Sequence, residues 1–493
     1  MSLKNQVQLI TYVDRLANGG LDKLDTLLTN EFAGLFGGVH LLPFFNPIDG
    51  EDAGFDPIDH TEVDARIGTW ADIASIGATH DIMADLIVNH VSAQSLVFQD
   101  VLAKGSQSPY FDLIMTKEKV FGSEASQADI DKIYRPRPTP CFTPMTCATG
   151  EVMNVWTTFT SNQIDIDVTG EQGQAYLDRI LDTFEQNKIK LIRLDAAGYA
   201  IKKAGTNCFM LDDTFDFINA LSAKANSRGM NCLVEIHSYY KTQIEIAKRC
   251  EAVYDFALPP LVLHTLFNND PQALYDWLSI APRNCVTVLD THDGIGIVDV
   301  GPEGDKPGLL THEQIDNLVE SIHRNSQDES RKATGAAASN VDLYQVNCTY
   351  LDALGNNKQD YLLARAIQFF APGIPQVYYA GVLGLNNDMP LLAKSQVGRD
   401  INRPYLDETI LQNALATPFF AAMKTLIQLR NSHPAFNGEF TITLDEKVLS
   451  LQWQLAEDVI CLHVDTQHHT ASIVTMNNNV VLQTIDIKNE SIK

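Results

Sequence analysis

The sequence is short of positive charge. Among 493 residues, 36 Lys and Arg stand against 62 Asp and Glu, which gives a formal net charge of −26. Nucleic acids and anionic membrane surfaces both reward clustered Lys and Arg, so neither is expected as the main partner. The chain also lacks a run of 18 apolar residues and a charged start followed by an apolar segment. No membrane span and no signal peptide are therefore expected, and we expect a cytoplasmic protein.

Paired cysteines are missing as well. The 8 cysteines are scattered, stand mostly in apolar runs and show no C-x-x-C spacing. We therefore expect reduced core thiols rather than zinc ligands or disulfides. Hydrophobic residues make up 45% of the chain, which is ordinary for a globular protein and excludes global disorder.

Eight short β-rich runs alternate with amphipathic helical patterns. The runs cover 7–13, 38–44, 82–90, 189–198, 232–237, 252–258, 285–293 and 374–381. Between two of them, Tyr176, Ile180 and Phe184 share one helical face at 3.6-residue spacing. Buried strands that alternate with helices predict an α/β protein with a (β/α)₈ TIM barrel. A doubly wound open sheet is the alternative, which is disfavoured because no G-x-G-x-x-G follows the first strand.

Two intervals are too long for plain loops, and both leave the carboxyl ends of predicted strands. Active sites of such barrels lie at this end, so both insertions are expected to wall the site. After residue 437 the apolar period changes to two, which predicts a small C-terminal antiparallel β domain. The expected organisation is a barrel over 1–90, 169–294 and 357–436, insertions over 91–168 and 295–356, and a β domain over 437–493.

Three acids follow predicted strands: Asp195, Glu235 and Asp293. Arg193 and Asp195 are two residues apart, so both should point into the barrel mouth. Burying three acids costs several kcal/mol unless they are paired or functional. A neighbouring Arg193 should keep Asp195 ionised, as a nucleophile needs. Glu235, close to other carboxylates, should hold its proton, as a general acid needs.

Four segments carry a family resemblance. They are ADLIVNH (84–90), IRLDAAGY (192–199), LVEIH (233–237) and LDTHDG (289–294), and in this order they resemble the four short regions of the α-amylase superfamily. VQLITYVDR, DAGFDPIDH, IYRPRP and VGRDINR narrow the resemblance to the sucrose phosphorylases, over nearly the whole chain and more weakly in the C-terminal domain. The resemblance implies retaining phosphorolysis of sucrose by inorganic phosphate through a covalent β-glucosyl-enzyme. The products would be α-D-glucose 1-phosphate and D-fructose, with transglucosylation to other acceptors and without a cofactor.

The same resemblance implies roles for individual residues. Asp195 would be the nucleophile, Glu235 the general acid and base, and Asp293 the group that tightens on sugar hydroxyls in the transition state. The glucosyl ring would be bound by Asp52, Phe55, His90, Gln163, Arg193, His292 and Arg399. Fructose would meet Asp342 and Gln345. Phosphate would be bound by Arg137 and Tyr344, with His237 a weaker third candidate.

Metal binding is not expected. Asn89 occupies a position that ligates calcium in many amylases, but the resemblance is to calcium-independent members. Asp85 is expected to orient its neighbours within the barrel, and His468 and His469 are expected to be solvated surface residues rather than a metal pair.

Alternatives to a sucrose phosphorylase stay open. The chain could be a phosphorylase of another α-glucoside, such as glucosylglycerol, or an α-glucosidase or amylosucrase-like enzyme that does not need phosphate. A non-catalytic relative is the third alternative, against which the three intact acids argue. The acidic Asp342 argues against a phosphorylated fructose, because the two negative charges would repel. The oligomeric state, a homodimer included, is not decided by the sequence.

Overall fold

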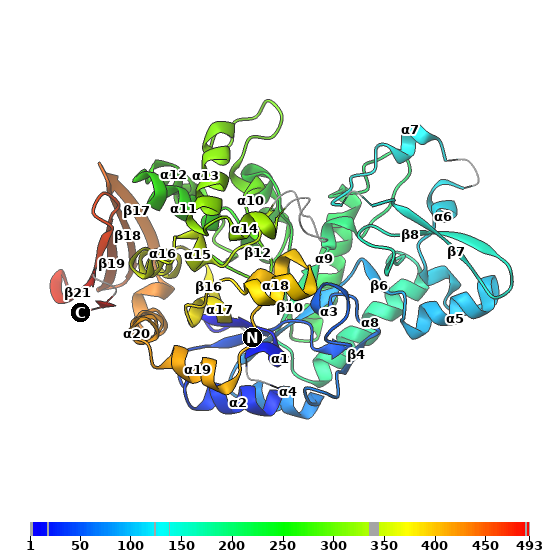
Figure 1. Cartoon of the computed structure of the whole chain (residues 1–493), viewed down its shortest axis with the longest axis horizontal. Coiled ribbons are helices and arrows are strands. Elements are labelled where there is room, and N and C mark those ends of the chain that lie inside the picture. Colours follow the sequence, from blue (N-terminus) through cyan, green and yellow to red (C-terminus); the bar gives the residue numbers. More distant parts are fainter. Residues whose placement is uncertain are drawn as a thin grey trace.

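Eight parallel strands close into a barrel at the centre of the molecule (Figure 1). The computed structural model describes residues 3–16, 19–122, 125–137, 139–334, 345–488 and 491–492. Around the barrel the strand order is β1-β16-β13-β12-β11-β10-β5-β2. Their bounds are β1 Gln8–Thr11, β2 Gly38–Leu41, β5 Asp81–Ile87, β10 Leu191–Asp195, β11 Asn231–Val234, β12 Val253–Asp255, β13 Cys285–Thr287 and β16 Ile374–Tyr378. Each strand overlaps one predicted run, so the predicted barrel is confirmed.

Helices surround the strands and bury their apolar faces against them. The longer ones are α2 Leu21–Thr29, α8 Glu171–Gln186, α9 Asp212–Ser227, α10 Tyr240–Arg249, α11 Leu258–Asn268, α12 Gln272–Ile280, α16 Lys358–Phe370 and α20 Pro418–Ser432. On α8 the predicted face that contains Ile180 and Phe184 is fully buried. In β10, Ile192 and Leu194 are also fully buried, which leaves the alternate residues to point into the barrel mouth.

The seventh barrel strand is shorter than its sequence run. The run 285–293 was predicted as a strand, but β13 ends at Thr287. At that point β13 pairs with Pro375 of β16, and proline has no N–H to extend the ladder. His292 and Asp293 therefore lie in the loop beyond the strand, which is a correction to the predicted boundary.

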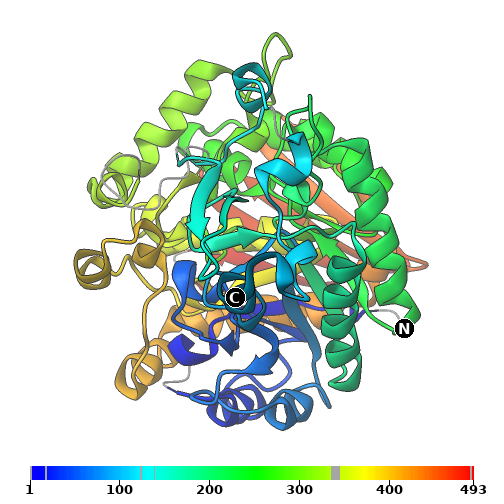
Figure 2. The same cartoon turned by 90° about the vertical axis from the view of Figure 1, so that its right-hand side faces the viewer.

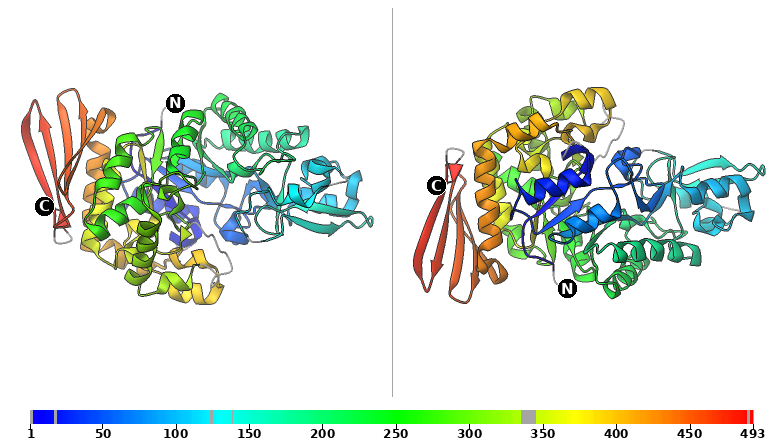
Figure 3. Two further views of the ribbon diagram at one scale, coloured as in Figure 1. Left: turned by 90° about the horizontal axis from the view of Figure 1, so that it is seen from above. Right: turned by 90° about the horizontal axis from the view of Figure 1, so that it is seen from below.

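A lobe projects from the barrel between β5 and α8. It contains the hairpin of β7 (Phe142–Thr146) with β8 (Val152–Trp156), and the pairing of β6 (His90–Ser92) with β9 (Gln163–Asp165). Figure 3 shows this lobe at one end of the molecule, opposite the C-terminal sheet, and Figure 2 views the molecule from the side of the lobe. Pairing of β6 with β9 brings His90 and Gln163 to the edge of the barrel.

A second excursion follows β13. Within it, β14 (Ile295–Gly296) pairs antiparallel with β15 (Gln345–Val346), and α13 (His312–Asn325) lies between them in the chain. The pairing places Gln345 beside Gly296 and returns it to the barrel mouth. Residues 335–344 lie outside the described part of the chain.

The C-terminal residues form an antiparallel sheet in the order β17-β18-β19-β20-β21-β22, as the alternating pattern predicts. The strands are β17 Glu439–Asp445, β18 Val448–Leu455, β19 Asp458–Asp465, β20 Thr470–Asn477, β21 Val480–Lys488 and β22 Ser491–Ile492. Its buried face packs on the barrel helices: the indole nitrogen of Trp453 donates to the Phe370 carbonyl of α16 at 2.8 Å. Figure 3 shows the sheet against α16 and α20, far from the projecting lobe.

The cysteines are all reduced. All eight are buried free thiols, as predicted. No helix in the described ranges is long and apolar enough to cross a membrane.

The two neighbouring histidines near the C-terminus behave differently. The His468 side chain is 68% exposed, as expected, whereas the prediction that His469 is a solvated surface residue is wrong. His469 joins the turn before β20 to the barrel: its Nδ1 lies 2.5 Å from Asp360 of α16, and its Nε2 lies 2.9 Å from Asn269 after α11.

The His469 contacts predict a pH-dependent attachment of the sheet. Its hydrogen bond to Asp360 raises the pKa of His469, so the added stability is full below the unfolded value of about 6.5 and is lost as pH rises through the raised pKa. His469→Asn should therefore lower the unfolding midpoint more at about pH 6 than at about pH 9. Thermal unfolding followed by circular dichroism measures both values. His468→Asn is the matched control, and an equal response of the two variants at both pH values would contradict the role.

Candidate active site

A cavity of about 530 Å³ opens at the carboxyl ends of the barrel strands. Every site residue that the sequence predicted and the structure describes lines it. These are Asp52, Phe55, His90, Arg137, Gln163, Arg193, Asp195, Glu235, His237, His292, Asp293, Gln345 and Arg399. Asp342 and Tyr344 lie outside the described residues. Residues from the barrel and both long excursions therefore meet at one site.

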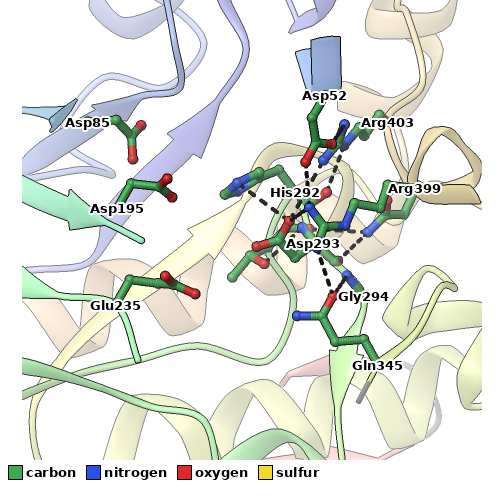
Figure 4. A network of polar contacts seen from close by, with 12 residues as sticks. Asp52, Asp85, Asp195, Glu235, His292, Asp293, Gly294, Gln345, Arg399 and Arg403 are labelled. Carbon is green, nitrogen blue, oxygen red and sulfur yellow. Dashed lines mark hydrogen bonds and ion pairs between the residues drawn. The ribbon is translucent and has the colours of Figure 1, made fainter. Parts of the chain in front are cut away.

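The guanidinium of Arg193 holds the acids on one side of the cavity. Its Nη1 lies 2.6 Å from Asp195 and 2.8 Å from Asp85, and its Nη2 lies 3.9 Å from Glu235. Asp195 ends β10, and Glu235 directly follows β11. Figure 4 shows the carboxyl groups of Asp195 and Glu235 directed toward the group around Asp293.

Burial changes the ionisation of Asp195. It raises the pKa of Asp195 to about 7, the charge of Arg193 opposes this rise, and the Glu235 carboxylate adds to it. The expectation that Arg193 keeps Asp195 ionised is therefore wrong near neutral pH, where part of the population is protonated, because desolvation outweighs the nearby guanidinium. Arg193 Nη1 lies 2.6 Å from Asp195 and its Nη2 lies 3.9 Å from Glu235, so its charge acts more strongly on Asp195.

Asp85 lies behind this pair and is fully buried. Its carboxylate contacts Arg193 and, at 2.9 Å, the Nε2 of His40. Burial would raise the pKa of Asp85, but His40 and Arg193 outweigh it and lower the pKa to about 2. Asp85 thus remains ionised and orients Arg193 from within the barrel.

Arginines surround the acids on the opposite side of the cavity. Arg399 Nη1 lies 2.9 Å from both Asp52 and Asp293, and Arg403 Nη1 lies 3.3 Å from Asp52 (Figure 4). Burial opposes ionisation of both acids, yet the arginines hold the pKa of Asp52 and of Asp293 well below the usual range. Asp52 has a φ of 53°, a left-handed conformation that Asp tolerates better than most residues. These ion pairs hold it there.

Two histidines also line the recess between the two groups of acids. The rings of His292 and Phe55 stack at 4.9 Å, and His90 Nε2 lies 3.1 Å from Gln163 Nε2. Burial lowers the pKa of His292 to about 3 and that of His90 to about 4. Both imidazoles are therefore neutral at physiological pH and can accept as well as donate hydrogen bonds.

The residues predicted to contact phosphate or fructose, where the structure describes them, lie at separate places on the cavity wall. Arg137 Nη2 lies 3.5 Å from Asp52, and its guanidinium lies 5.7 Å from the centre of the Phe159 ring. His237 lies beside Glu235, with 3.9 Å between its Nε2 and the carboxyl oxygen. Gln345 accepts a hydrogen bond from the Gly294 amide at 3.1 Å. Arg137 thus approaches from the lobe, and Gln345 from the second excursion.

The sequence interpretation missed Arg403. Its side chain is fully buried, and its Nε donates to the His292 carbonyl at 2.7 Å. Arg403 therefore fixes the loop that carries Asp293 as well as the position of Asp52. The motif VGRDINR contains both arginines, but nothing in its spacing shows that Arg403 turns inward beside Arg399.

Lys202 was missed as well, although it joins three elements next to the site. Its ammonium contacts Asn89 at 2.5 Å, the Tyr199 carbonyl at 2.6 Å and Asp165 of β9 at 2.6 Å. The side chain is 1% exposed. A fixed ammonium thus ties the turn after β5, the projecting lobe and the segment after Asp195 together. Among the described residues, no group of three or more His, Cys, Asp or Glu could hold a metal ion.

The structure also brings four aromatic residues together in one wall of the cavity. Tyr199 lies 4.7 Å from Phe209 and 5.2 Å from Phe159, and Tyr134 lies 4.5 Å from Phe209, measured between ring centres. All four line the cavity on the side of the lobe. They provide an apolar surface next to the polar recess, suited to the faces of a sugar or another ring.

Curated relatives match nearly the whole chain. A sucrose phosphorylase of Agrobacterium vitis is 58% identical over 96% of this chain and 97% of the relative. A sucrose phosphorylase of Bifidobacterium adolescentis is 50% identical over 92% of this chain and 90% of the relative. The chain belongs to the sucrose phosphorylase family. No protein-family model matches it.

Solved structures agree with this family membership. A sucrose 6F-phosphate phosphorylase from Thermoanaerobacter thermosaccharolyticum superposes with a TM-score of 0.89 at 37% identity, over 99% of this chain and 98% of that one. An α-amylase from H. orenii has a TM-score of 0.67 at 14% identity, over 94% of this chain and 90% of that one. The second likeness shows the shared fold alone.

The raised pKa of Asp195 predicts that its carboxylate destabilises the fold. Below the unfolded pKa of about 3.9 both states are protonated, and between that value and about 7 only the unfolded state ionises. Stability is therefore lost as pH rises through this window. Asp195→Asn should abolish activity but raise the unfolding free energy by roughly 2–4 kcal/mol at about pH 8, and by less at about pH 5.

Urea unfolding at the two pH values measures the effect of Asp195→Asn. Asp216→Asn, on the exposed side of α9, is a matched control for the chemical change. A variant that is less stable than the wild type at about pH 8 would contradict the destabilising carboxylate.

The buried ammonium predicts a large effect for Lys202→Met. Removing one partner of a buried ion pair leaves Asp165 uncompensated, so we expect a loss of about 3–5 kcal/mol in urea unfolding. Lys203→Met is the control, because that neighbouring side chain is 58% exposed and pairs with Asp213 at the surface. Equal losses in the two variants would contradict the structural role of Lys202.

Proposed function

We propose that this chain catalyses the reversible, retaining phosphorolysis of sucrose to α-D-glucose 1-phosphate and D-fructose. The observation that carries the proposal is the pairing of Asp195 and Glu235 across a recess whose far side is held by arginine-bound Asp52 and Asp293. The relatives that are 58% and 50% identical to this chain are named sucrose phosphorylase. The strongly acidic protein thus retains local positive charge inside the site, where an anionic acceptor would need it.

In the first displacement, Asp195 attacks the anomeric carbon of the glucosyl unit while Glu235 donates its proton to the departing fructosyl oxygen. The product is a β-glucosyl ester on Asp195 and free fructose. In the second displacement, a phosphate oxygen attacks the same carbon, its proton passes to Glu235, and the ester bond to Asp195 breaks. Two inversions give net retention. Other acceptors whose hydroxyl groups reach the ester would be glucosylated in the same way.

The recess opposite Asp195 provides the glucosyl site in this proposal. Asp52 and Arg399 would bind the hydroxyls far from the reacting carbon, and Phe55 would provide an apolar platform. Asp293 would bind hydroxyls whose contacts strengthen as positive charge develops at the ring. The remaining polar contacts would come from His90, Gln163, Arg193 and His292.

The acceptor side takes the other predicted residues. We assign fructose to Asp342 and Gln345, and phosphate to Arg137, Tyr344 and His237. An arginine fork matches phosphate oxygens in pairs, which supports Arg137 as the main anion contact. An acidic Asp342 would repel a fructose that carries a phosphate group. A relative from Thermoanaerobacterium thermosaccharolyticum is named for such a substrate, sucrose 6F-phosphate.

The organisation of the chain follows the same proposal. We assign the barrel to 1–90, 169–294 and 357–436, the two site-forming insertions to 91–168 and 295–356, and the β domain to 437–493. We also propose that the enzyme acts in the cytoplasm and without a metal or cofactor. A homodimer remains compatible with these assignments.

Incubation with sucrose, with and without inorganic phosphate, tests the function directly. Expected is glucose 1-phosphate in a phosphate-dependent amount, with little free glucose. Free glucose at a rate that ignores phosphate would mean a hydrolase. Turnover of glucosylglycerol or of sucrose 6F-phosphate in place of sucrose would show that the acceptor assignment at Asp342 is wrong.

Arg137→Ala separates the phosphate role from the glucosyl role. The variant should lower kcat/KM for phosphate roughly 10-fold or more, since a charge-assisted contact is lost, and change kcat/KM for sucrose less. In ping-pong kinetics each ratio reports only its own half-reaction, so initial rates over both substrates separate the effects. Lys132→Ala, an exposed side chain of the same lobe, is the control. An equal loss for both substrates would assign Arg137 to the glucosyl site instead.

A further inference from the structure

A buried carboxylate stands behind His237 and is not used by the mechanism above. Asp299 Oδ2 lies 3.0 Å from His237 Nδ1, and Asp299 is fully buried whereas the His237 side chain is 19% exposed. The opposite ring nitrogen, Nε2, lies 3.9 Å from Glu235 and 3.4 Å from Gln345 Nε2. His237 thus has one nitrogen on a buried acid and the other at the cavity.

The fold holds this carboxylate firmly. Its Oδ1 accepts hydrogen bonds from the Ser238 amide at 3.0 Å and from Gln243 Nε2 at 2.5 Å. Both donors belong to the segment that follows β11, whereas Asp299 lies after β14 in the second excursion. The two segments are therefore joined through Asp299 at the point where His237 leaves the barrel strand.

The imidazole ring has little freedom to turn. It stacks on Phe256 with 3.8 Å between ring centres and 14° between planes. A Cβ at Gly296 would lie 3.0 Å from Asp299 Oδ2 and 3.1 Å from His237 Cε1, so only glycine allows this close approach without displacement. Gly296 is the residue that pairs with Gln345. The ring is thus confined by Phe256 on one side and by the Gly296 backbone near its edge.

We propose that Asp299 is a positioning residue for the phosphate acceptor: it holds His237 with Nδ1–H directed to its own carboxylate and Nε2 directed to the phosphate that attacks the glucosyl-enzyme. The inference rests on the proposed function. An acceptor carboxylate behind Nδ1 fixes the tautomer and stabilises the imidazolium when it forms. Nε2 then accepts from a protonated phosphate oxygen or, as imidazolium, donates to an ionised one. Asp299 itself touches neither substrate nor Glu235.

Asp299→Asn tests this role. The amide would place a donor against Nδ1 of His237, or against Ser238 and Gln243 if it turned the other way, so the tautomer with Nδ1–H is no longer favoured. Expected is a roughly 10-fold lower kcat/KM for phosphate, the effect of losing one hydrogen bond to a charged group, with kcat/KM for sucrose within about twofold. Asp305→Asn, an exposed acid in the same excursion, is the matched control and should change neither ratio.

A double-mutant cycle distinguishes positioning from general damage to the structure. His237→Gln alone should lower kcat/KM for phosphate by a similar factor, and adding Asp299→Asn should lower it no further, because the residue that Asp299 positions is gone. Independent, multiplied losses, or equal losses for sucrose and phosphate, would overturn the proposal. Wild-type enzyme that forms no phosphate-dependent glucose 1-phosphate would instead overturn the proposed function.

Gly296→Ala supplies a second variant that keeps every polar group. Its methyl group should push His237 and Asp299 apart and reproduce the selective loss for phosphate. Thermal unfolding of each variant shows whether it is folded. If Asp299→Asn fails to fold, Gly296→Ala and His237→Gln decide the matter: Gly296→Ala with an unchanged kcat/KM for phosphate would overturn the proposal.

Discussion

The contact of Arg193 with Asp85, Asp195 and Glu235 is the interaction on which the site depends. Three carboxyl groups in a low-dielectric barrel mouth would repel one another and resist ionisation. A fully desolvated guanidinium at their centre keeps Asp85 ionised and opposes the rise in the pKa of Asp195. It also makes them unequal, because it lies 2.6 Å from Asp195 and 3.9 Å from Glu235. That inequality supports the different roles proposed for the two carboxyl groups.

The same solution recurs on the other side of the recess with different partners. Arg399 and Arg403 carry the charge of Asp52 and Asp293, and Asp52 adopts a left-handed backbone conformation between them. A chain with a net charge of −26 thus concentrates buried arginines where its buried acids are. Since removing either member of such a pair leaves an uncompensated charge, the ion pairs of Asp52 and Asp293 also contribute to the stability of the barrel.

Long-range tethers hold the excursions that complete the cavity. Lys202 fastens the projecting lobe to the segment after Asp195 through Asp165, and Asp299 fastens the second excursion to the segment after Glu235. Each tether is a buried charged group with several hydrogen-bonding partners, so it specifies one arrangement where exposed loops would allow many. The walls of the cavity are therefore tied to the segments that follow Asp195 and Glu235.

The sequence by itself determined the architecture and most of the site. Period-two and period-3.6 patterns mark the strands and helices because burial of apolar side chains acts locally, and acids that follow strands of a parallel barrel meet at one end whatever the loops do. Only the tertiary structure decided that His469 is tethered, that Arg403 and Lys202 turn inward and that Asp299 stands behind His237. In each case the partner lies in another segment of the chain, and burial of a charged side chain is decided by its partner, which no local pattern contains.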